Sequence, residues 1–441
     1  MGPATPTPRL AMFANIDLSG IMRGRSFPIA RLDALLEDGL PWVPANLLIS
    51  PLNTIPNPNP FGPMGEVRLQ GDPDRRMVLP AQGARPAMAV YVADIAGHDG
   101  TPWLVCPRTQ LRAAIDRLER EHGLVLRVGF EQELYVWDLQ DRPTPAFSLA
   151  GSRAISDLAE EVYATLATAD ARLDQFVAEY GANQFEVASP PLEALRAADE
   201  AVLVREAIRD AARARGARAS FAPKPRPDLP GSGVHIHLSL WTRDGRPATA
   251  FSSPGGIALS AEAGAFTAGI LRGLESVMAF TLGSPNSFDR LQPSHWVGVF
   301  RAYAVRNREA AIRLCPRAPG AEGEHSGASL EFRLVDASAS PHLALAALLQ
   351  AGIDGLDAKL DPPPHVEGDP AALDPAERAR LGVDPVPSRL EDVLAAAAGG
   401  DAPVRWFGDL MWSALQAARR NDLLDAERAG DAYAEKVAAA V

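Results

Sequence analysis

The sequence predicts an α+β protein with a small N-terminal β-rich domain followed by a larger domain of strands and helices. Two turn signals, Ser19-Gly20 and Asp99-Gly100, each lie between apolar runs and predict β-hairpins in the first hundred residues. From residue 106 on, apolar residues recur at helical spacing. Such stretches cover residues 106–123, 192–216, 260–283 and 341–357. We therefore expect two domains, residues 1–104 and 105–441.

The composition excludes several classes of protein. The chain has 441 residues, of which 47% are hydrophobic and 22% are charged, which is typical of a globular protein with a large core. A formal net charge of −12 argues against nucleic acid or an anionic membrane surface as a partner. There is no signal-peptide core and no apolar run long enough to span a membrane, so we expect a cytoplasmic protein.

The segment VLRVGFEQELYVW, residues 125–137, alternates like a strand but carries two glutamates on one face. Glu131 and Glu133 share this face with two aromatic residues, whereas the opposite face is apolar apart from Gln132. Because residues i and i+2 of a strand lie roughly 6.6 Å apart, the two carboxylates repel each other unless a cation lies between them. A solvated outer face is the alternative, but it would normally mix basic residues or threonine with the acids.

Three further segments repeat this pattern, which favours a binding site. Polar residues share one face in each of them: Gln184 and Glu186 in NQFEVAS, His235, His237 and Ser239 in GVHIHLSL, and Glu331 and Arg333 in SLEFRLVD. Four polar-faced strands predict a curved sheet whose concave side is a charged cavity. Carboxylates with imidazoles and no thiolate suit Mg²⁺ or Mn²⁺ rather than zinc or copper.

Arginines are dense in one later region of the chain. They are Arg290, Arg301, Arg306, Arg308 and Arg313, followed by Arg333 on the last strand. An exposed helix face is the alternative for Arg301 or Arg306. Guanidinium groups opposite acid-bound metals are what phosphoryl transfer needs, because its catalysis is mostly positioning and charge neutralisation. No phosphate-binding glycine loop is present, so a nucleotide must be held in another way.

Taken together, these motifs resemble the glutamine synthetases over nearly the whole chain. The resemblance rests on FANIDLSGIMRG, GFEQELYVWD, EYGANQFEV, FAPKPRPDLPGSGVHIHLSL, NSFDRLQP, RNREAAIR and LEFRLVDASASPHLALAALLQAGIDGL, in family order. It implies an N-terminal β-grasp-like domain and a catalytic domain in which a curved antiparallel sheet forms a funnel with helices outside. It also implies a double-ring homo-oligomer, a dodecamer, whose active sites lie between neighbouring subunits.

The resemblance assigns roles to individual residues. It places Glu133, Glu179 and Glu186 at one metal ion and Glu131, His235 and Glu331 at a second, with two or more Mg²⁺ or Mn²⁺ ions per site. ATP is held by His237, Ser239, Lys224 and Arg313, and L-glutamate by Gly231, Arg290 and Arg333. The positions that act on the reacting groups are Arg308, Arg333 and Trp296. The implied reaction forms γ-glutamyl phosphate from ATP and glutamate, and a nitrogen nucleophile then displaces the phosphate.

The chain departs from the ammonia-using pattern at the nucleophile side. Trp296 stands where the family's flap glutamate is expected, and the N-terminal loop PWVPANLLISPLNTI carries no acid. Loss of both carboxylates favours an amine that carries carbon, as in the branch that makes γ-glutamyl amides from polyamines or monoamines. Pro230, Ser329 and Asn183 also replace usual residues, which affects contacts to glutamate and nucleotide rather than the metal site.

Three functions are therefore compared. The first is a γ-glutamyl-amine synthetase, the second a true glutamine synthetase that uses ammonia, and the third a catalytically silent relative with a structural or regulatory role. A family member that has lost its catalytic activity has usually lost metal ligands first, and all six metal-ligand residues that the resemblance assigns are present in this chain. Among amines, a small monoamine is favoured over a dicationic polyamine, which needs anionic partners at its far end.

Overall fold

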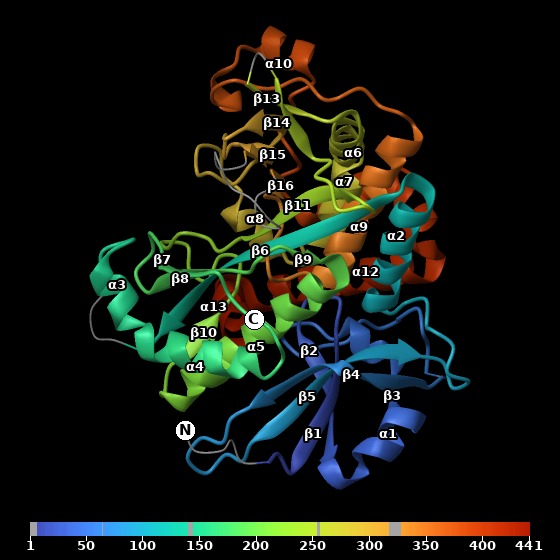
Figure 1. The fold of residues 1–441 in the computed structure, drawn as a ribbon, viewed down its shortest axis with the longest axis vertical. Coiled ribbons are helices and arrows are strands. Elements are labelled where there is room, and N and C mark those ends of the chain that lie inside the picture. The colour runs from blue at the N-terminus through green and yellow to red at the C-terminus, as the bar shows by residue number, and fades with distance from the viewer. Residues whose placement is uncertain (1–6, 64, 140–143, 254–255, 317–327) are drawn as a thin grey trace.

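The computed structural model describes residues 7–63, 65–139, 144–253, 256–316 and 328–441. Two large sheets organise these residues, with the N-terminal sheet below the catalytic sheet in Figure 1. Both α-helix and β-sheet are present in the order that the sequence predicted, so the α+β fold is confirmed. Among the described residues, none of the helices is both long enough and apolar enough to cross a bilayer.

The N-terminal sheet has the strand order β2-β1-β5-β4-β3. Its strands are β1 (Leu10–Ile16), β2 (Met22–Pro28), β3 (Leu40–Trp42), β4 (Val67–Leu79) and β5 (Met88–Ala96), with α1 (Leu32–Asp38) between β2 and β3. The central pair β1 and β5 is parallel and the other neighbours are antiparallel, which is the β-grasp-like arrangement. The predicted hairpin at Ser19-Gly20 is confirmed, because β1 pairs with β2 across this turn.

The second predicted hairpin, at Asp99-Gly100, is present but short. The turn is followed by one antiparallel bridge, between Ala96 and Pro102, with backbone hydrogen bonds from the Gly97 N–H to the Thr101 carbonyl and from the Trp103 N–H to the Ile95 carbonyl. Pro102 has no backbone N–H to donate to a ladder, and Pro107 already begins the helix α2. β5 therefore takes its strand partners from β1 and β4.

The catalytic sheet contains nine strands within the described residues, in the order β14-β15-β16-β11-β6-β8-β7, with β9 and β10 also paired to β6. They are β6 (Leu124–Trp137), β7 (Gln175–Ala178), β8 (Gln184–Ala188), β9 (Leu192–Glu193), β10 (Arg218–Ser220), β11 (Val234–Thr242), β14 (Phe300–Val305), β15 (Ala310–Cys315) and β16 (Ser329–Phe332). The sheet is antiparallel except between β14 and β15, which are parallel. A separate hairpin joins β12 (Ala250–Ser253) to β13 (Gly256–Leu259).

Helices cover the outer face of the catalytic sheet (Figure 1). The described helices that follow the N-terminal sheet are α2 (Pro107–His122), α3 (Leu149–Ala154), α4 (Ser156–Ala167), α5 (Ala194–Ala214), α6 (Ala261–Arg272), α7 (Leu274–Thr281), α8 (Pro285–Arg290), α9 (Pro341–Asp357), α10 (Pro375–Leu381), α11 (Leu390–Ala398), α12 (Ala402–Ala429) and α13 (Tyr433–Ala440). α2 ends at Gly123, whose φ of 66° is the left-handed conformation that favours glycine. α9 is buried among α2, α5, α6 and α7, so the core continues outward from the sheet.

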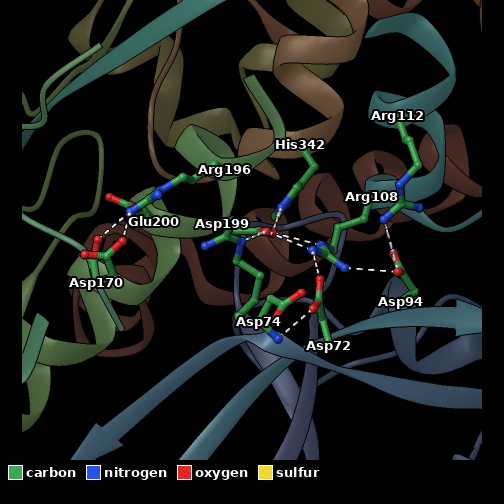
Figure 2. Close-up of polar contacts among 11 residues, drawn as sticks. Asp72, Asp74, Asp94, Arg108, Arg112, Asp170, Arg196, Asp199, Glu200 and His342 are labelled. Atoms are coloured by element: carbon green, nitrogen blue, oxygen red, sulfur yellow. Dashed lines mark hydrogen bonds and ion pairs between the residues drawn. The ribbon is translucent and has the colours of Figure 1, made fainter. Parts of the chain in front are cut away.

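A buried ion-pair network joins the N-terminal sheet to the helices (Figure 2). Arg108, at the start of α2, donates from Nε and Nη2 to the two oxygens of Asp199 on α5, both at 2.8 Å. The same guanidinium lies 2.9 Å from Asp72 on β4 and 3.0 Å from Asp94 on β5. His342 Nε2 on α9 lies 2.8 Å from Asp199 Oδ1. Asp199 is therefore bonded by residues of two other helices, α2 and α9. Arg108 is bonded both to the N-terminal sheet and to α5.

Replacing Asp199 by asparagine is expected to lower the free energy of unfolding by about 1.5–3 kcal/mol, because charge-assisted hydrogen bonds in a buried site are lost. Burial opposes ionisation of Asp199, but Arg108 and His342 lower its pKa to about 2 from 3.8. Its stabilising contribution is thus present above pH 3.8 and is lost as the pH falls towards 2.

Urea unfolding measured near pH 7 tests this prediction. The matched control is Asp170→Asn, because Asp170 pairs with Arg196 on the surface with 93% of its side chain exposed. An exposed pair contributes about 0–1 kcal/mol. Equal effects of the two substitutions would show that the Arg108 network does not stabilise the fold.

Candidate active site

A cavity of about 450 Å³ opens on the polar face of the catalytic sheet. Of the fifteen residues to which the resemblance assigned roles, thirteen line it: Glu131, Glu133, Glu179, Glu186, Lys224, Gly231, His235, Arg290, Trp296, Arg308, Arg313, Glu331 and Arg333. They come from strands and loops that are up to two hundred residues apart in the sequence. The two remaining residues, His237 and Ser239, line an adjoining cavity that shares Glu131.

The strand register explains why these side chains meet. Glu131 on β6 lies opposite His235 on β11, and Glu133 lies opposite Glu186 on β8. On the other side of β11, His237 lies opposite Glu331 of β16. Antiparallel partners on one face place their Cβ atoms about 5 Å apart, so the register alone brings acids and histidines together.

The opposite face of β6 is part of the core, as the alternation predicted. Phe130 and Leu134 are buried among the helices, and Gln132 is buried with them. Gln132 is not unsatisfied, because its Oε1 accepts from Arg205 Nε at 2.6 Å and its Nε2 donates to the Ala201 carbonyl at 3.0 Å. The buried amide thus ties β6 to α5.

The carboxylates in the cavity lie close enough to disfavour ionisation of one another. Burial and the nearby charges of Glu131, Glu133 and Glu179 raise the pKa of Glu186 to about 8. Burial and Glu133 also raise the pKa of Glu179. Such clusters of oxygen donors are the sites that hard divalent cations occupy, since a cation removes this repulsion.

The described residues of this cavity and the adjoining one contain two sets of three side chains that could hold a metal ion. Within each set, the ligand atoms lie within 4.8 Å of one another. One contains Glu131, Glu186 and His235, and the other contains Glu131, His237 and Glu331. Glu131 belongs to both, and although burial opposes its ionisation, hydrogen bonds to His235 and His237 keep its pKa well below the usual range. This grouping differs from the one that the resemblance implied, which separated Glu131 from Glu186 and left out His237.

Arginines surround the last acid of the cluster. Glu331 is 1% exposed, Arg313 Nε lies 2.6 Å from its Oε2, and Arg333 Nη1 bonds its Oε1. Burial opposes ionisation of Glu331, but Arg333, His235 and Arg313 lower its pKa. By contrast, Arg301 does not line the cavity: it lies on the strand β14, part-buried, and pairs with Glu275 and the Leu271 carbonyl, so the exposed helix face stated as its alternative is wrong. The arginines beside Glu331 can thus hold anions.

The loop before β11 needs glycine where it contacts Arg290. A Cβ on Gly231 would lie 2.4 Å from Arg290 Cγ, so a side chain there would displace the arginine. Two residues that the sequence analysis did not assign hold this loop: Tyr135 Oη donates to the Pro230 carbonyl at 2.9 Å, and Gln184 Nε2 donates to the Gly231 carbonyl at 2.9 Å. Tyr135 lies on the polar face of β6, and this position was the available signal.

The substitutions at Asn183 and Ser329 have local explanations. Asn183 has a φ of 63°, a conformation that asparagine tolerates better than other residues with a side chain, so it can replace the usual glycine. Ser329 Oγ lies 3.1 Å from His237 Nδ1 in the adjoining cavity. There the serine orients a histidine rather than supplying a charge.

The segment that carries Trp296 is held by a buried acid that the sequence analysis missed. Glu309 accepts from the Ser294 N–H at 3.2 Å and from the Trp296 N–H at 2.7 Å. Arg333 Nη2 donates to the Trp296 carbonyl. Trp296 has a φ of 57°, so these bonds hold a conformation that tryptophan rarely adopts. The only available signal was an acid between arginines in RNREAAIR.

Comparison with known proteins agrees with this geometry. The family model described as "Glutamine synthetase N-terminal domain" matches residues 4–103, and "Glutamine synthetase, catalytic domain" matches residues 104–434. The chain belongs to the glutamine synthetase family. Members of this family are ATP-dependent ligases, and the chain is a ligase of this class.

The relatives of this family member include amide-forming enzymes of two kinds. The γ-glutamylpolyamine synthetase GlnA3 of Streptomyces coelicolor is 37% identical over 397 residues, which are 87% of this chain and 83% of the relative. A glutamine synthetase of Thermococcus kodakarensis is 32% identical over 88% of this chain and 84% of its own. A solved structure titled "Crystal structure of novel glutamine synthase homolog" is 35% identical, with a TM-score of 0.86, and covers 99% of this chain and 100% of its own.

Proposed function

We propose that this family member is a γ-glutamyl-amine synthetase that joins the γ-carboxylate of L-glutamate to a small primary monoamine, with ATP as the phosphoryl donor. The observation that carries the proposal is the flap: the acid and arginine cluster is complete, but the residue at its open side is Trp296 and not a carboxylate. A γ-glutamylpolyamine synthetase among the relatives supports an amine over ammonia.

The donor set fits Mg²⁺ or Mn²⁺, because the facing carboxylates disfavour one another's ionisation in the absence of a cation. We assign two or more such ions to Glu131, Glu133, Glu179, Glu186, His235 and Glu331. When bound, they supply charge neutralisation for phosphoryl transfer. ATP is assigned to the adjoining cavity with His237 and Ser239, and to Lys224 and Arg313, which line the main cavity.

The proposed reaction has two steps. An oxygen of the glutamate γ-carboxylate attacks the terminal phosphorus of ATP, which releases ADP and forms γ-glutamyl phosphate. The amine nitrogen then attacks the γ-carbonyl carbon, the carbon–oxygen bond to phosphate breaks with its electron pair, and one proton leaves the nitrogen. Gly231, Arg290 and Arg333 hold glutamate, while Arg308 and Arg333 neutralise the phosphoryl group.

A true glutamine synthetase is the second candidate, and the Thermococcus kodakarensis relative supports it. Against it stands the lack of acids at the nucleophile side, since neither Trp296 nor the loop of residues 41–55 offers a carboxylate. A catalytically silent protein is disfavoured, because the six proposed metal ligands lie around one cavity. We also propose a homo-oligomeric double ring in which a neighbour's 41–55 loop completes the site.

A panel of amines tests the proposed function. With glutamate and ATP present, we expect kcat/KM for at least one small monoamine to exceed that for ammonium by about a hundredfold, a difference of roughly 2.7 kcal/mol. The carbon of the amine recovers affinity by burying apolar surface at roughly 25 cal/mol per Å², which ammonium cannot do. Release of ADP and formation of the γ-glutamyl amide are measured together. Equal rates with ammonium and with the best amine would support the plain synthetase instead.

A further inference from the structure

Three aromatic rings from distant segments form one wall of the active-site cavity. Phe147 precedes α3, Tyr180 lies between β7 and β8, and Trp296 follows α8. The Phe147 and Tyr180 ring centroids are 5.2 Å apart with the planes at 77°, and those of Tyr180 and Trp296 are 5.7 Å apart at 58°. These are ordinary edge and tilted contacts, so the rings form one surface.

This wall is unusual because its rings face the cavity and not the core. Phe147 is 55% exposed, Tyr180 is 63% exposed and Trp296 is 53% exposed. The backbone that carries two of the rings is held in place: the Phe147 N–H donates to the Ala178 carbonyl at 2.8 Å, and the Trp296 N–H donates to Glu309. A fixed apolar surface inside a charged cavity indicates a ligand with an apolar part.

The other proposed substrates do not fit this surface. Glutamate carries two carboxylates and an ammonium group, and nucleotide is assigned to the cavity around His237 on the far side of Glu131. Tyr180 follows directly after Glu179, and its N–H donates to Glu179 Oε2 at 3.2 Å. The aromatic wall therefore starts directly beside Glu179 of the acid cluster. We place the entry of the nucleophile at this boundary.

We infer that Phe147, Tyr180 and Trp296 form the pocket for the carbon group of the nucleophile, which is a primary monoamine with a branched alkyl or aryl group. This inference rests on the proposed function and names its substrate class. Edge and face contacts to three rings favour a compact or flat apolar group over an extended chain. Phe147 and Tyr180 are thus specificity residues in addition to Trp296.

A second cation at the far end of a polyamine is poorly accommodated beyond Trp296. The neighbouring cavity there is lined by residues that include Arg306, Arg308, Glu309, His365 and Glu367. Both oxygens of Glu309 already accept backbone N–H groups, from Ser294 and from Trp296. Among the described lining residues, Glu367 is then the remaining carboxylate, and the same lining contains two arginines, Arg306 and Arg308.

Alanine substitutions at two of the rings test the inference. We expect Tyr180→Ala and Phe147→Ala each to raise KM for isopropylamine or benzylamine about tenfold or more. KM for ATP is expected to stay within about twofold, and the loss of kcat/KM with ammonium, which has no carbon to bury against the rings, is expected to be several-fold smaller than the loss with either amine. The matched controls are Tyr163→Ala on α4 and Phe251→Ala on β12, which remove rings that are 39% and 54% exposed and do not line the cavity.

The outcomes separate this inference from the proposed function. An equal loss with every nucleophile, or a higher kcat/KM for putrescine than for any monoamine, overturns the inference while the amide-forming function stands. If neither amines nor ammonium yield ADP, the proposed function fails. The pocket is then tested by quenching of tryptophan fluorescence with benzylamine, and equal quenching in Trp296→Phe and the wild type overturns it.

Discussion

Replacing Glu186 by glutamine is expected to reduce glutamate- and amine-dependent ADP formation at least a thousandfold while the protein stays folded. A thousandfold loss corresponds to roughly 4 kcal/mol of transition-state stabilisation. Glu186 lies opposite Glu133 across two paired strands, and its neighbours raise its pKa to about 8. Glutamine keeps the size of the side chain but cannot balance the charge of a divalent cation, so we expect metal affinity to be lost with activity.

Metal binding distinguishes a ligand from a structural residue. In the wild type we expect Mn²⁺ to raise the melting temperature, since a ligand that binds only the folded state stabilises it. In Glu186→Gln this increase is expected to be much smaller. The metal-free melting temperature at pH 7 is expected not to fall, because Glu186, whose pKa is raised to about 8, is already mostly neutral there and glutamine is neutral too. Glu160→Gln on the exposed side of α4 is the control. Turnover within tenfold of wild type in both Glu133→Gln and Glu186→Gln would refute the metal assignment.

The polar face of the site could be predicted because strand geometry has a period of two. Once Glu131 and Glu133 were seen to alternate with core residues, the same pattern in three other strands implied one shared cavity. The partners across the strands could not be predicted, because register depends on turns and long-range packing. Thus His237 lies opposite Glu331 and Glu131 reaches both histidines, although neither contact follows from the sequence.

Residues that act through the backbone or through buried pairs escaped prediction. Asp199 and Glu309 look like ordinary surface acids in sequence, but each is buried and bonded to groups from other segments. The sequence analysis assigned no role to Phe147 or Tyr180, since nothing in a single segment shows that two rings far apart in the chain meet a third. The α+β fold was recoverable from periodicity, whereas these contacts depend on the completed tertiary structure.

Replacing Trp296 by glutamate is expected to shift the ratio of kcat/KM values towards ammonium by about three hundredfold relative to the wild type. Two effects act in the same direction. A carboxylate at the cavity wall gains a charge-assisted contact with ammonium worth about 1.5–3 kcal/mol. Loss of the indole removes apolar surface that would cover the amine, at roughly 25 cal/mol per Å². Together they amount to about 3.4 kcal/mol.

Two further variants separate these effects. Trp296→Phe keeps an aromatic ring beside Tyr180 and is expected to retain the preference for monoamines. Trp296→Gln has the shape of the glutamate without its charge, so it is expected to weaken amine use without improving ammonium use. The backbone of the flap keeps its bonds from Arg333 and to Glu309 in all three variants, because both residues contact backbone atoms of Trp296. If the glutamate and glutamine variants have the same ratio, charge at this position does not select the nucleophile.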